Sequence, residues 1–329
     1  MTTSRHLVAL MQNHIAGDEQ RFITVATQIA AQEARQGHGK LAQELRELIH
    51  AAKTKAATVT RRGAGPVLIA QPKGELASLL AARYSDVRLN AMVLPDALKE
   101  RLARVITEQR QQEALRARGL WPRRKLLLVG PPGSGKTMSA AALAGELKLP
   151  LFTVLYDGLI GKLMGETATR LRLIFDAVAM QRGVYFFDEF DAIGAQRAVP
   201  NDVGEIRRVL NSFLQFVEND EGPSLIISAT NHAELLDGAL FRRFDDVITY
   251  DLPTPEIAEG IIENHLATFD LGDVHWPEVL QGTAGLSQAD VARAADDAAK
   301  VAVLRGSDRI STPMLVTALE ERLAATKAR

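Results

Sequence analysis

One short stretch constrains the fold of this chain more than any other part of it. Residues 130–137 read Gly-Pro-Pro-Gly-Ser-Gly-Lys-Thr. They follow the apolar run Leu126–Val129, which predicts a buried parallel strand, and precede the Ala-rich run Met138–Leu147, which predicts a helix. A strand, a glycine-rich loop and Lys-Thr at a helix start are the context that defines a P-loop. The stretch therefore predicts a parallel α/β sheet with a phosphate site at one strand end.

Each part of this loop has a chemical purpose. Glycines let backbone N–H groups curl around phosphate oxygens where a Cβ would clash, and a helix N-terminus adds partial positive charge. We expect Lys136 to reach the β- and γ-phosphates of a nucleotide and the Thr137 hydroxyl to bind Mg²⁺. A glycine-rich turn that binds nothing is the alternative, and the agreement of spacing, Lys-Thr pair and flanking segments disfavours it. The predicted nucleotide-binding residues are Gly130, Pro131, Pro132, Gly133, Ser134, Gly135, Lys136, Thr137 and Met138.

A second candidate site follows the apolar segment 184–187, which ends in Asp188 and Glu189. Ligands bind at the carboxyl edge of parallel sheets, so acids at this position are expected to face the P-loop. Asp188 is predicted to orient Mg²⁺, through a water molecule, and Glu189 to polarise the water that attacks the γ-phosphate. Acids that merely end a strand are the alternative, which the neighbouring P-loop disfavours.

Bulk composition excludes several classes of function. A net charge of −1 over 329 residues disfavours nucleic acid as a partner, because such proteins usually carry a basic domain. The absence of cysteine excludes disulfides, thiolate catalysis and Cys-based zinc sites. No apolar run approaches the roughly 18 residues that a membrane span needs, and no signal-peptide region follows Met1–His6. The expectation is a cytoplasmic protein with no membrane partner.

The chain is predicted to contain a three-layer αβα core between helical segments. Apolar runs separated by helical stretches favour a five-stranded parallel sheet with right-handed crossovers. The predicted strands are 126–129, 151–155, 184–187, 225–229 and 247–250. The predicted domains are a small all-α N-terminal docking domain (1–54), a linker rich in Gly, Pro and charge (55–90), the αβ domain (91–252) and a helical C-terminal lid (253–329).

Five motifs in order resemble those of the AAA+ ATPases, and specifically of the AAA family proper. The P-loop and Asp188-Glu189 are the first two, and the Ser-Ala-Thr-Asn of residues 228–231 is similar to the sensor 1 strand. Residues 236–245 resemble the second region of homology, and residues 285–290 resemble the lid signature of that family. The resemblance covers about residues 90–329 and excludes residues 1–60.

This resemblance implies an AAA+ nucleotide-binding core that hydrolyses ATP with Mg²⁺ and assembles with copies of itself into a ring, a hexamer. Asn231 is then expected to hold the attacking water. Arg243, with Arg242 as the next candidate, is expected to act as an arginine finger on a neighbour's γ-phosphate. Together with Glu189, these residues form the predicted catalytic set.

Two stretches depart from the family pattern. The family usually has Arg-Pro-Gly-Arg-Phe-Asp-Arg, whereas residues 242–246 read Arg-Arg-Phe-Asp-Asp and keep one fully matching finger, Arg243. Residues 162–166 match the pore loop, but Leu163 stands where many members place an aromatic residue, and aromatic anchors bury more area. Core packing is the alternative role for Leu163 and Met164. Residues 198–204 match the second pore loop without a strong signal.

Three uses of ATP hydrolysis fit these motifs. The family resemblance favours remodelling or unfolding of a protein client by a ring. An ATP-dependent regulatory assembly is the alternative, in which residues 1–54 control a partner enzyme such as a protease or a defence effector. Remodelling of nucleic acid is the third, and the near-neutral charge disfavours it.

Overall fold

The computed structural model describes residues 71–159, 166–190, 203–232 and 241–327. These residues cluster into two compact units, an αβ unit (described residues up to 260, with 283–291) and a helical unit (261–282 with 292–327). Several predicted segments lie wholly or partly outside the described residues: the N-terminal domain 1–54, residues 55–70 of the linker, residues 162–165 of the first pore loop with Leu163 and Met164, residues 198–202 of the second pore loop, and residues 236–240 of the second region of homology.

The αβ unit is built on a six-stranded sheet with the order β1-β3-β4-β5-β2-β6. Five of its strands run parallel and match the predicted five to within one residue at each end. The strands are β1 (Leu80–Arg83), β2 (Lys125–Val129), β3 (Leu151–Val154), β4 (Val184–Phe187), β5 (Leu225–Thr230) and β6 (Asp246–Thr249).

The sixth strand, β1, corrects the prediction that residues 55–90 are a linker. Residues 76–83 form the short helix α4 (Leu76–Leu79) and β1, and β1 pairs antiparallel with β3 at the edge of the sheet. The sequence Leu-Ala-Ala-Arg has no strand-like alternation of its own. A partner about 70 residues further along the chain makes it a strand, and local propensity does not reveal such pairing.

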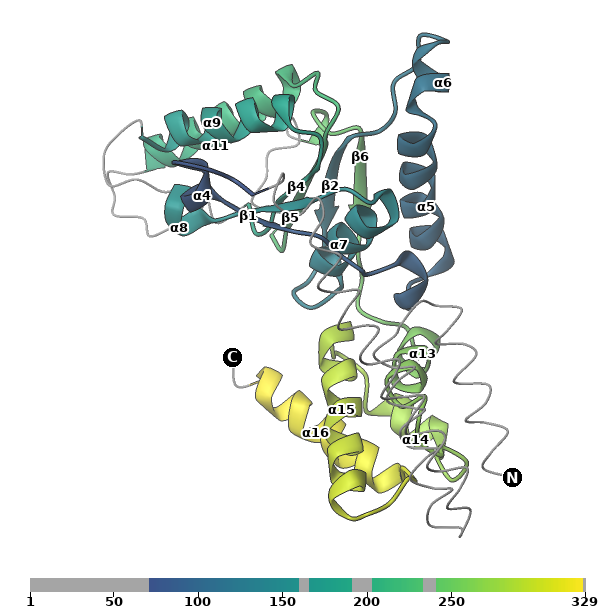
Figure 1. Cartoon of the computed structure of the whole chain (residues 1–329). Helices are drawn as coiled ribbons and strands as arrows, with labels where there is room; N and C mark the ends of the chain where they lie inside the picture. The colour runs from purple at the N-terminus through teal and green to yellow at the C-terminus, as the bar shows by residue number, and fades with distance from the viewer. Residues whose placement is uncertain (1–70, 160–165, 191–202, 233–240, 328–329) are drawn as a thin grey trace, which may run out of the picture. The chain divides into compact units, whose positions relative to one another are not determined.

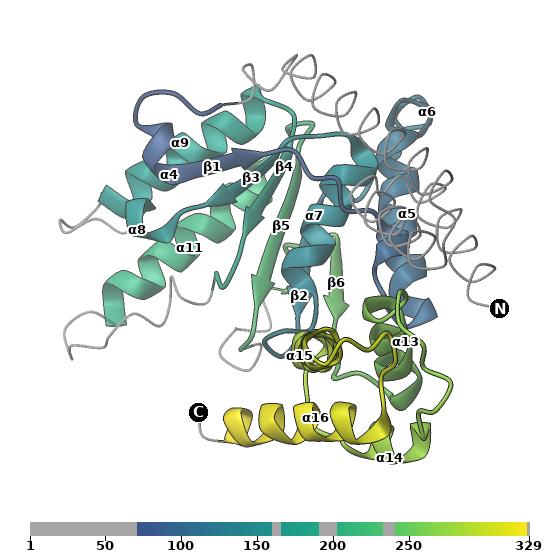
Figure 2. The ribbon, with the colours of Figure 1, turned by 60° about the horizontal axis from the view of Figure 1, so that its bottom comes forward.

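Helices cover both faces of the sheet, which confirms the predicted three-layer core (Figures 1 and 2). Successive strand residues point to opposite faces. Leu126 and Leu128 therefore pack with α5 (Asp96–Arg110) and α7 (Lys136–Leu147), while Leu127 packs with α9 (Glu166–Met180) and α11 (Val203–Asn219).

Apolar residues at helical spacing over residues 94–118 predict one long amphipathic helix, but the structure ends α5 at Arg110. The buried residues of this range, apart from Leu94, lie in α5 and include Leu98, Leu102, Val105 and Ile106. The following helix α6 (Gln112–Arg116) buries no residue, so no tertiary packing supports one continuous helix through Gln111. The remaining short helices of this unit are η2 (Leu89–Ala91) and α8 (Tyr156–Leu159).

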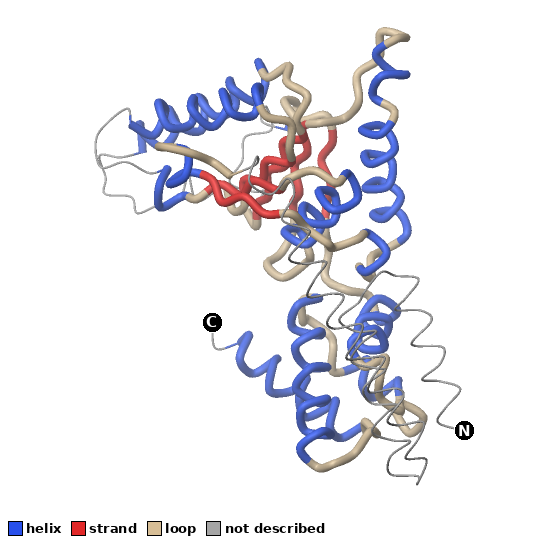
Figure 3. Tube along the Cα trace, viewed as in Figure 1, coloured by secondary structure: helices blue, strands red, loops and turns tan. Residues whose placement is uncertain are grey.

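The chain after residue 254 is helical, as predicted (Figure 3). Its helices are α13 (Pro255–His265), α14 (Trp276–Gln281), α15 (Gln288–Leu304) and α16 (Thr312–Lys327). Pro255 is the first residue of α13, where a proline loses no intrahelical hydrogen bond. No helix in the described part of the chain is long and apolar enough to cross a membrane.

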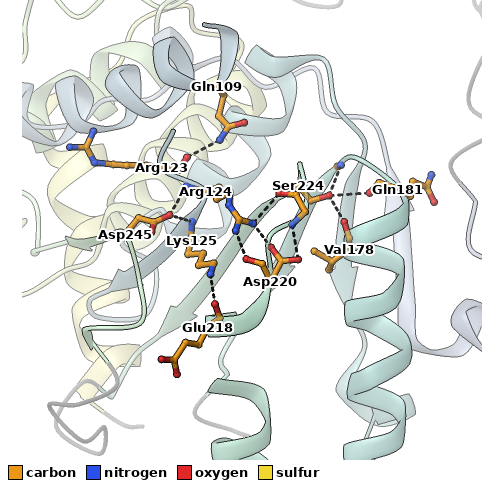
Figure 4. A network of polar contacts seen from close by, with 12 residues as sticks. Gln109, Arg123, Arg124, Lys125, Val178, Gln181, Glu218, Asp220, Ser224 and Asp245 are labelled. Atoms are coloured by element: carbon orange, nitrogen blue, oxygen red, sulfur yellow. Dashed lines mark hydrogen bonds and ion pairs between the residues drawn. The ribbon is translucent and has the colours of Figure 1, made fainter. Parts of the chain in front are cut away.

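A buried ion pair joins the amino-terminal ends of β2 and β5 (Figure 4). The guanidinium of Arg124, next to β2, binds both the carboxylate and the carbonyl oxygen of Asp220, and it also donates to the Gly222 carbonyl at 3.0 Å. The two side chains are only 11% and 4% exposed. Both charged groups of this pair therefore have hydrogen-bond partners, as burial of charge requires.

We expect Asp220→Asn to lower the free energy of unfolding by about 3 kcal/mol, because removing one member of a buried pair leaves the other charge uncompensated. Urea titration of the purified protein measures this change. Glu221→Gln is the matched control, since Glu221 is the adjacent acid and is exposed. Equal midpoints for the two variants would show that the pair does not stabilise the fold.

Candidate nucleotide-binding and hydrolysis site

The P-loop connects the carboxyl end of β2 to the start of α7, as the sequence predicts. At its first residue only glycine fits: Gly130 has φ +155°, and a Cβ there would lie 2.4 Å from the Tyr250 carbonyl oxygen. The Tyr250 hydroxyl donates to Ser139 Oγ at 2.7 Å, and Ser139 donates to the Gly135 carbonyl at 3.1 Å. Burial raises the pKa of Tyr250 to about 12, so this hydroxyl stays protonated near neutral pH. Tyr250, directly after β6, therefore packs against the first residue of the loop and bonds the helix that follows it.

Lys136 is buried and its ammonium group lies inside the loop. Nζ donates to the carbonyl oxygens of Gly130 at 2.7 Å and Pro131 at 2.8 Å. Lys136 is also the first residue of the 12-residue helix α7, whose amino-terminal N–H groups carry partial positive charge. The loop therefore gathers two sources of positive potential where phosphate oxygens are predicted to bind.

Thr137 and Asp188 meet across the site. The Thr137 hydroxyl donates to Asp188 Oδ2 at 2.8 Å, which joins α7 to the end of β4. A hydroxyl and a carboxylate are oxygen ligands of the kind that Mg²⁺ prefers, and Mg²⁺ usually keeps waters and phosphate oxygens as its other ligands. Among the described residues no group of three or more His, Cys, Asp or Glu forms a metal cage. The donor set fits a nucleotide-bound Mg²⁺ rather than a metal held by protein alone.

Glu189 is held in an uncommon backbone conformation next to Asn231. Its φ of +51° is left-handed, which costs free energy for a residue other than glycine. The next residue anchors this turn, because Phe190 is fully buried and its N–H bonds the Ala229 carbonyl at 3.0 Å. Asn231 Nδ2 then donates to Glu189 Oε1 at 3.4 Å. The predicted base and the predicted water-holding amide thus lie together at the carboxyl ends of β4 and β5.

Arg242 and Arg243 do not join this constellation. They precede the amino-terminal end of β6, which runs parallel to β2 in the register Leu126 opposite Asp246. The P-loop follows the carboxyl end of β2. The arginines therefore lie at the amino-terminal edge of the sheet, opposite the carboxyl edge that holds the P-loop. The four residues of β6 span about 13 Å between the two edges. The structure brings together the predicted site residues 130–137, 188, 189 and 231. It places Arg242 and Arg243 at the amino-terminal end of β6, away from this group.

The departure from the family pattern at Asp246 has a structural counterpart. Asp246 occupies the position of the family's last arginine, and its carboxylate forms an ion pair with Arg101 of α5. Arg101 also donates to the Val247 carbonyl at 2.7 Å. The acid at this position therefore anchors α5 to the start of β6.

The segment that resembles the lid signature contacts the tip of the P-loop, and no local pattern in the sequence indicates this contact. Within the αβ unit, the Ala289 N–H donates to the Gly133 carbonyl at 3.0 Å. Ser287 and Asp290 form a capping box at the start of α15: the Ser287 hydroxyl donates to Asp290 Oδ2 at 2.6 Å, and the Asp290 N–H donates to Ser287 Oγ at 3.2 Å. Matching of sequence motifs locates residues 285–290, but it does not show that they contact the P-loop.

We expect Gly133→Ala to weaken ATP binding by about tenfold or more, which corresponds to about 1.4 kcal/mol. Gly133 has φ +76°, and a Cβ there would lie 2.4 Å from Ser287 Oγ and 3.1 Å from the Ala289 Cβ, so the loop tip has to shift. Titration with a fluorescent ATP analogue measures the affinity.

Gly119→Ala is the matched control for this substitution. Gly119 has a similar φ of +73°, but nothing lies within 4 Å of the Cβ that alanine would add. Alanine is strained by the positive φ in both variants, but only in Gly133→Ala does its Cβ collide with a neighbouring side chain. Equal ATP affinities for the two variants would contradict a role for the contact between the loop and residues 287–289.

Comparison with known proteins identifies the family of this chain. Residues 126–252 match the family model described as the ATPase family associated with various cellular activities (AAA). The uncharacterized AAA family ATPase y4kL of Sinorhizobium fredii is 36% identical over 237 residues, which cover 72% of this chain and 71% of that protein. The ATP-dependent zinc metalloprotease FtsH 1 of Methylacidiphilum infernorum is 35% identical over 271 residues, and FtsH of Helicobacter pylori is 33% identical over 261 residues.

A P-loop αβ core followed by a helical segment defines this chain as a nucleotide-binding P-loop protein. More specifically, the chain belongs to the AAA family of ATPases, which are ATP-hydrolysing enzymes. The FtsH matches cover 80% and 76% of this chain but only 42% and 41% of those proteins. The crystal structure of the FIGL-1 AAA domain has the same fold, with a TM-score of 0.60 and 22% identity over 80% of this chain and 97% of that domain.

Proposed function

We propose that this chain binds Mg²⁺ and ATP at residues 130–138 and hydrolyses ATP with the groups gathered at the carboxyl edge of its sheet. The observation that supports this most directly is the joint placement of two pairs, Thr137 with Asp188 and Asn231 with Glu189, at the carboxyl ends of the three consecutive strands β4, β5 and β2 of the sheet. Mg²⁺, when bound, neutralises developing charge on the phosphate oxygens, and Thr137 and Asp188 are the residues that would hold it.

Lys136, Glu189 and Asn231 have separate roles in the proposed hydrolysis. Lys136 contributes a positive charge inside the loop, toward the β- and γ-phosphates. Glu189 accepts the proton of the attacking water as general base, and the Asn231 amide helps to orient that water. The backbone turn at Glu189 supports this role, because a carboxylate fixed in place needs no reorganisation at the moment of reaction.

We propose further that the active form is a homo-oligomeric ring, a hexamer, in which Arg243 completes the site of a neighbouring subunit. The position of Arg243 at the edge opposite its own P-loop supports action on another subunit. An arginine finger supplied by a partner can accelerate phosphoryl transfer by ~10³-fold or more. A lone subunit would therefore be a poor enzyme.

Mixing two inactive variants tests this arrangement. We expect Arg243→Ala and Glu189→Gln each to hydrolyse ATP slowly alone, and a 1:1 mixture to regain activity. Random assembly gives about a quarter of the interfaces an intact base on one side and an intact finger on the other. Steady-state phosphate release at saturating ATP is the measurement.

The control mixture pairs Arg243→Ala with the double variant Arg243→Ala/Glu189→Gln, which supplies no finger and is expected to restore nothing. Full activity of Arg243→Ala by itself would show that hydrolysis does not depend on a shared site. The absence of any recovery in the first mixture would do the same.

We propose that hydrolysis remodels or unfolds a protein client. The similarity to the ATP-dependent zinc metalloprotease FtsH supports a protein as the substrate of the ATP cycle. An alternative is a regulatory assembly that controls a partner enzyme through residues 1–54. The aliphatic Leu163 at the predicted pore position favours this alternative, because it offers less area for gripping a chain. The net charge of −1 gives little support to nucleic-acid remodelling.

Leu163→Asp distinguishes the two leading functions. If the ring threads a client, this variant is expected to keep basal hydrolysis and to lose the stimulation of hydrolysis by an unfolded model protein such as casein, because a charge cannot hold apolar side chains. Lys162→Gln is the neighbouring control. Undiminished casein stimulation in Leu163→Asp would oppose threading and favour the regulatory alternative, in which deletion of residues 1–54 uncouples the partner.

A further inference from the structure

The side chain of Arg243 is held by one specific acid. Arg243 Nε lies 3.2 Å from Glu218 Oε2, near the carboxyl end of α11, and the two side chains are 34% and 59% exposed. The contact engages Nε, at the base of the guanidinium group. It therefore orients the plane of the group without using the terminal N–H groups, which form the edge that binds phosphate in two-point contacts.

Glu218 is itself fixed by the sheet. Its carbonyl oxygen accepts a hydrogen bond from Lys125 Nζ at 2.9 Å (Figure 4). Two residues further on, Asp220 binds Arg124 in the buried ion pair. Lys125 is itself buried, and burial and the adjacent Arg124 charge lower its pKa. The backbone that carries Glu218 is thus tied to the first residues of β2 at two points.

The backbone next to Arg243 is fixed to the same two residues. The Asp245 carboxylate accepts N–H bonds from Arg124 at 2.8 Å and Lys125 at 2.9 Å, and the Asp245 N–H donates to the Lys125 carbonyl at 2.8 Å. Phe244, between Asp245 and Arg243, is buried in the core. Both partners of the Arg243–Glu218 ion pair are therefore anchored on residues 124–125, although they come from different elements. Arg242 precedes this anchored segment and is exposed.

We propose that Glu218 is a positioning residue for the arginine finger. It holds the Arg243 guanidinium in one orientation on a rigid base, so that its terminal N–H groups meet the γ-phosphate of the neighbouring subunit. This inference rests on the proposed function of Arg243 in a shared site. Ordering a long side chain in advance removes part of the entropy that the transition state would otherwise lose, and geometry of this kind affects kcat more than binding.

Substitution of Glu218 tests the proposal in the full-length protein. We expect Glu218→Ala to lower kcat for ATP roughly tenfold, an effect in the range expected for a misplaced catalytic group. The affinity of its own P-loop for ATP is expected to stay unchanged, since the P-loop lies at the other edge of the sheet. Glu218→Gln keeps an oxygen at this position and is expected to retain kcat within about twofold. Glu221→Gln, a nearby exposed acid, is expected to match the wild type.

Two further measurements separate positioning from other roles. In an Arg243→Ala background, Glu218→Ala is expected to cause no additional loss of kcat, because the residue acts only through the arginine. In mixtures with Glu189→Gln, Glu218→Ala is expected to behave like Arg243→Ala and to recover activity from the partner's intact finger. The urea midpoint of Glu218→Ala reports its folding.

Several results would overturn the proposal. An unchanged kcat in Glu218→Ala, with a strong loss in Arg243→Ala, would show that the finger needs no such support. A rise in kcat would make Glu218 an inhibitory partner instead. A joint fall of ATP affinity and urea midpoint would assign Glu218 a structural role. Full turnover by Arg243→Ala would refute the proposed finger itself, and the positioning role with it.

Discussion

The buried pair of Arg124 and Asp220 is the interaction on which the arrangement of this αβ unit depends. It joins the start of β2 to the turn between α11 and β5, and it does so in an interior where an uncompensated charge would be costly. Adjacent residues extend it, since Lys125 binds the Glu218 carbonyl and Asp245 binds two backbone N–H groups. The amino-terminal edge of the sheet is thereby fixed by polar contacts, whereas the two faces of the sheet are held by apolar packing.

The proposed hydrolytic groups lie at the opposite edge, where the parallel strands end. Each group has its position because it directly follows a strand. The P-loop follows β2, Asp188 and Glu189 follow β4, and Asn231 follows β5. In the parallel sheet β5 lies between β4 and β2, and the carboxyl ends of the three strands meet at one edge. Side chains more than 40 residues apart therefore come within hydrogen-bond distance, as Thr137 and Asp188 do. The sheet therefore holds the proposed hydrolytic groups at the carboxyl ends of its parallel strands, and Arg243 lies near the amino-terminal end of β6.

The sequence predicted most of this frame, because its signals are local. Apolar runs locate the parallel strands within one residue, and the Lys136-Thr137 and Asp188-Glu189 pairs stand beside strand ends where ligands bind. The features it missed depend on partners distant in the chain. The strand β1 exists through pairing with β3, the Gly133 tip meets residues 287–289, and Asp246 is explained by Arg101 on another helix. No short-range pattern records such contacts, which arise only when the chain has folded.

The left-handed backbone at Glu189 limits which substitutions can stabilise this protein without loss of turnover. Backbone strain of this kind costs on the order of 1–3 kcal/mol, a sizeable part of the net stability of a domain. A glycine at this position would relieve the strain and remove the proposed general base in the same step. Stability and turnover are therefore opposed at a single residue. Selection for a more stable chain would have to act elsewhere, while selection for hydrolysis keeps the strained residue in place.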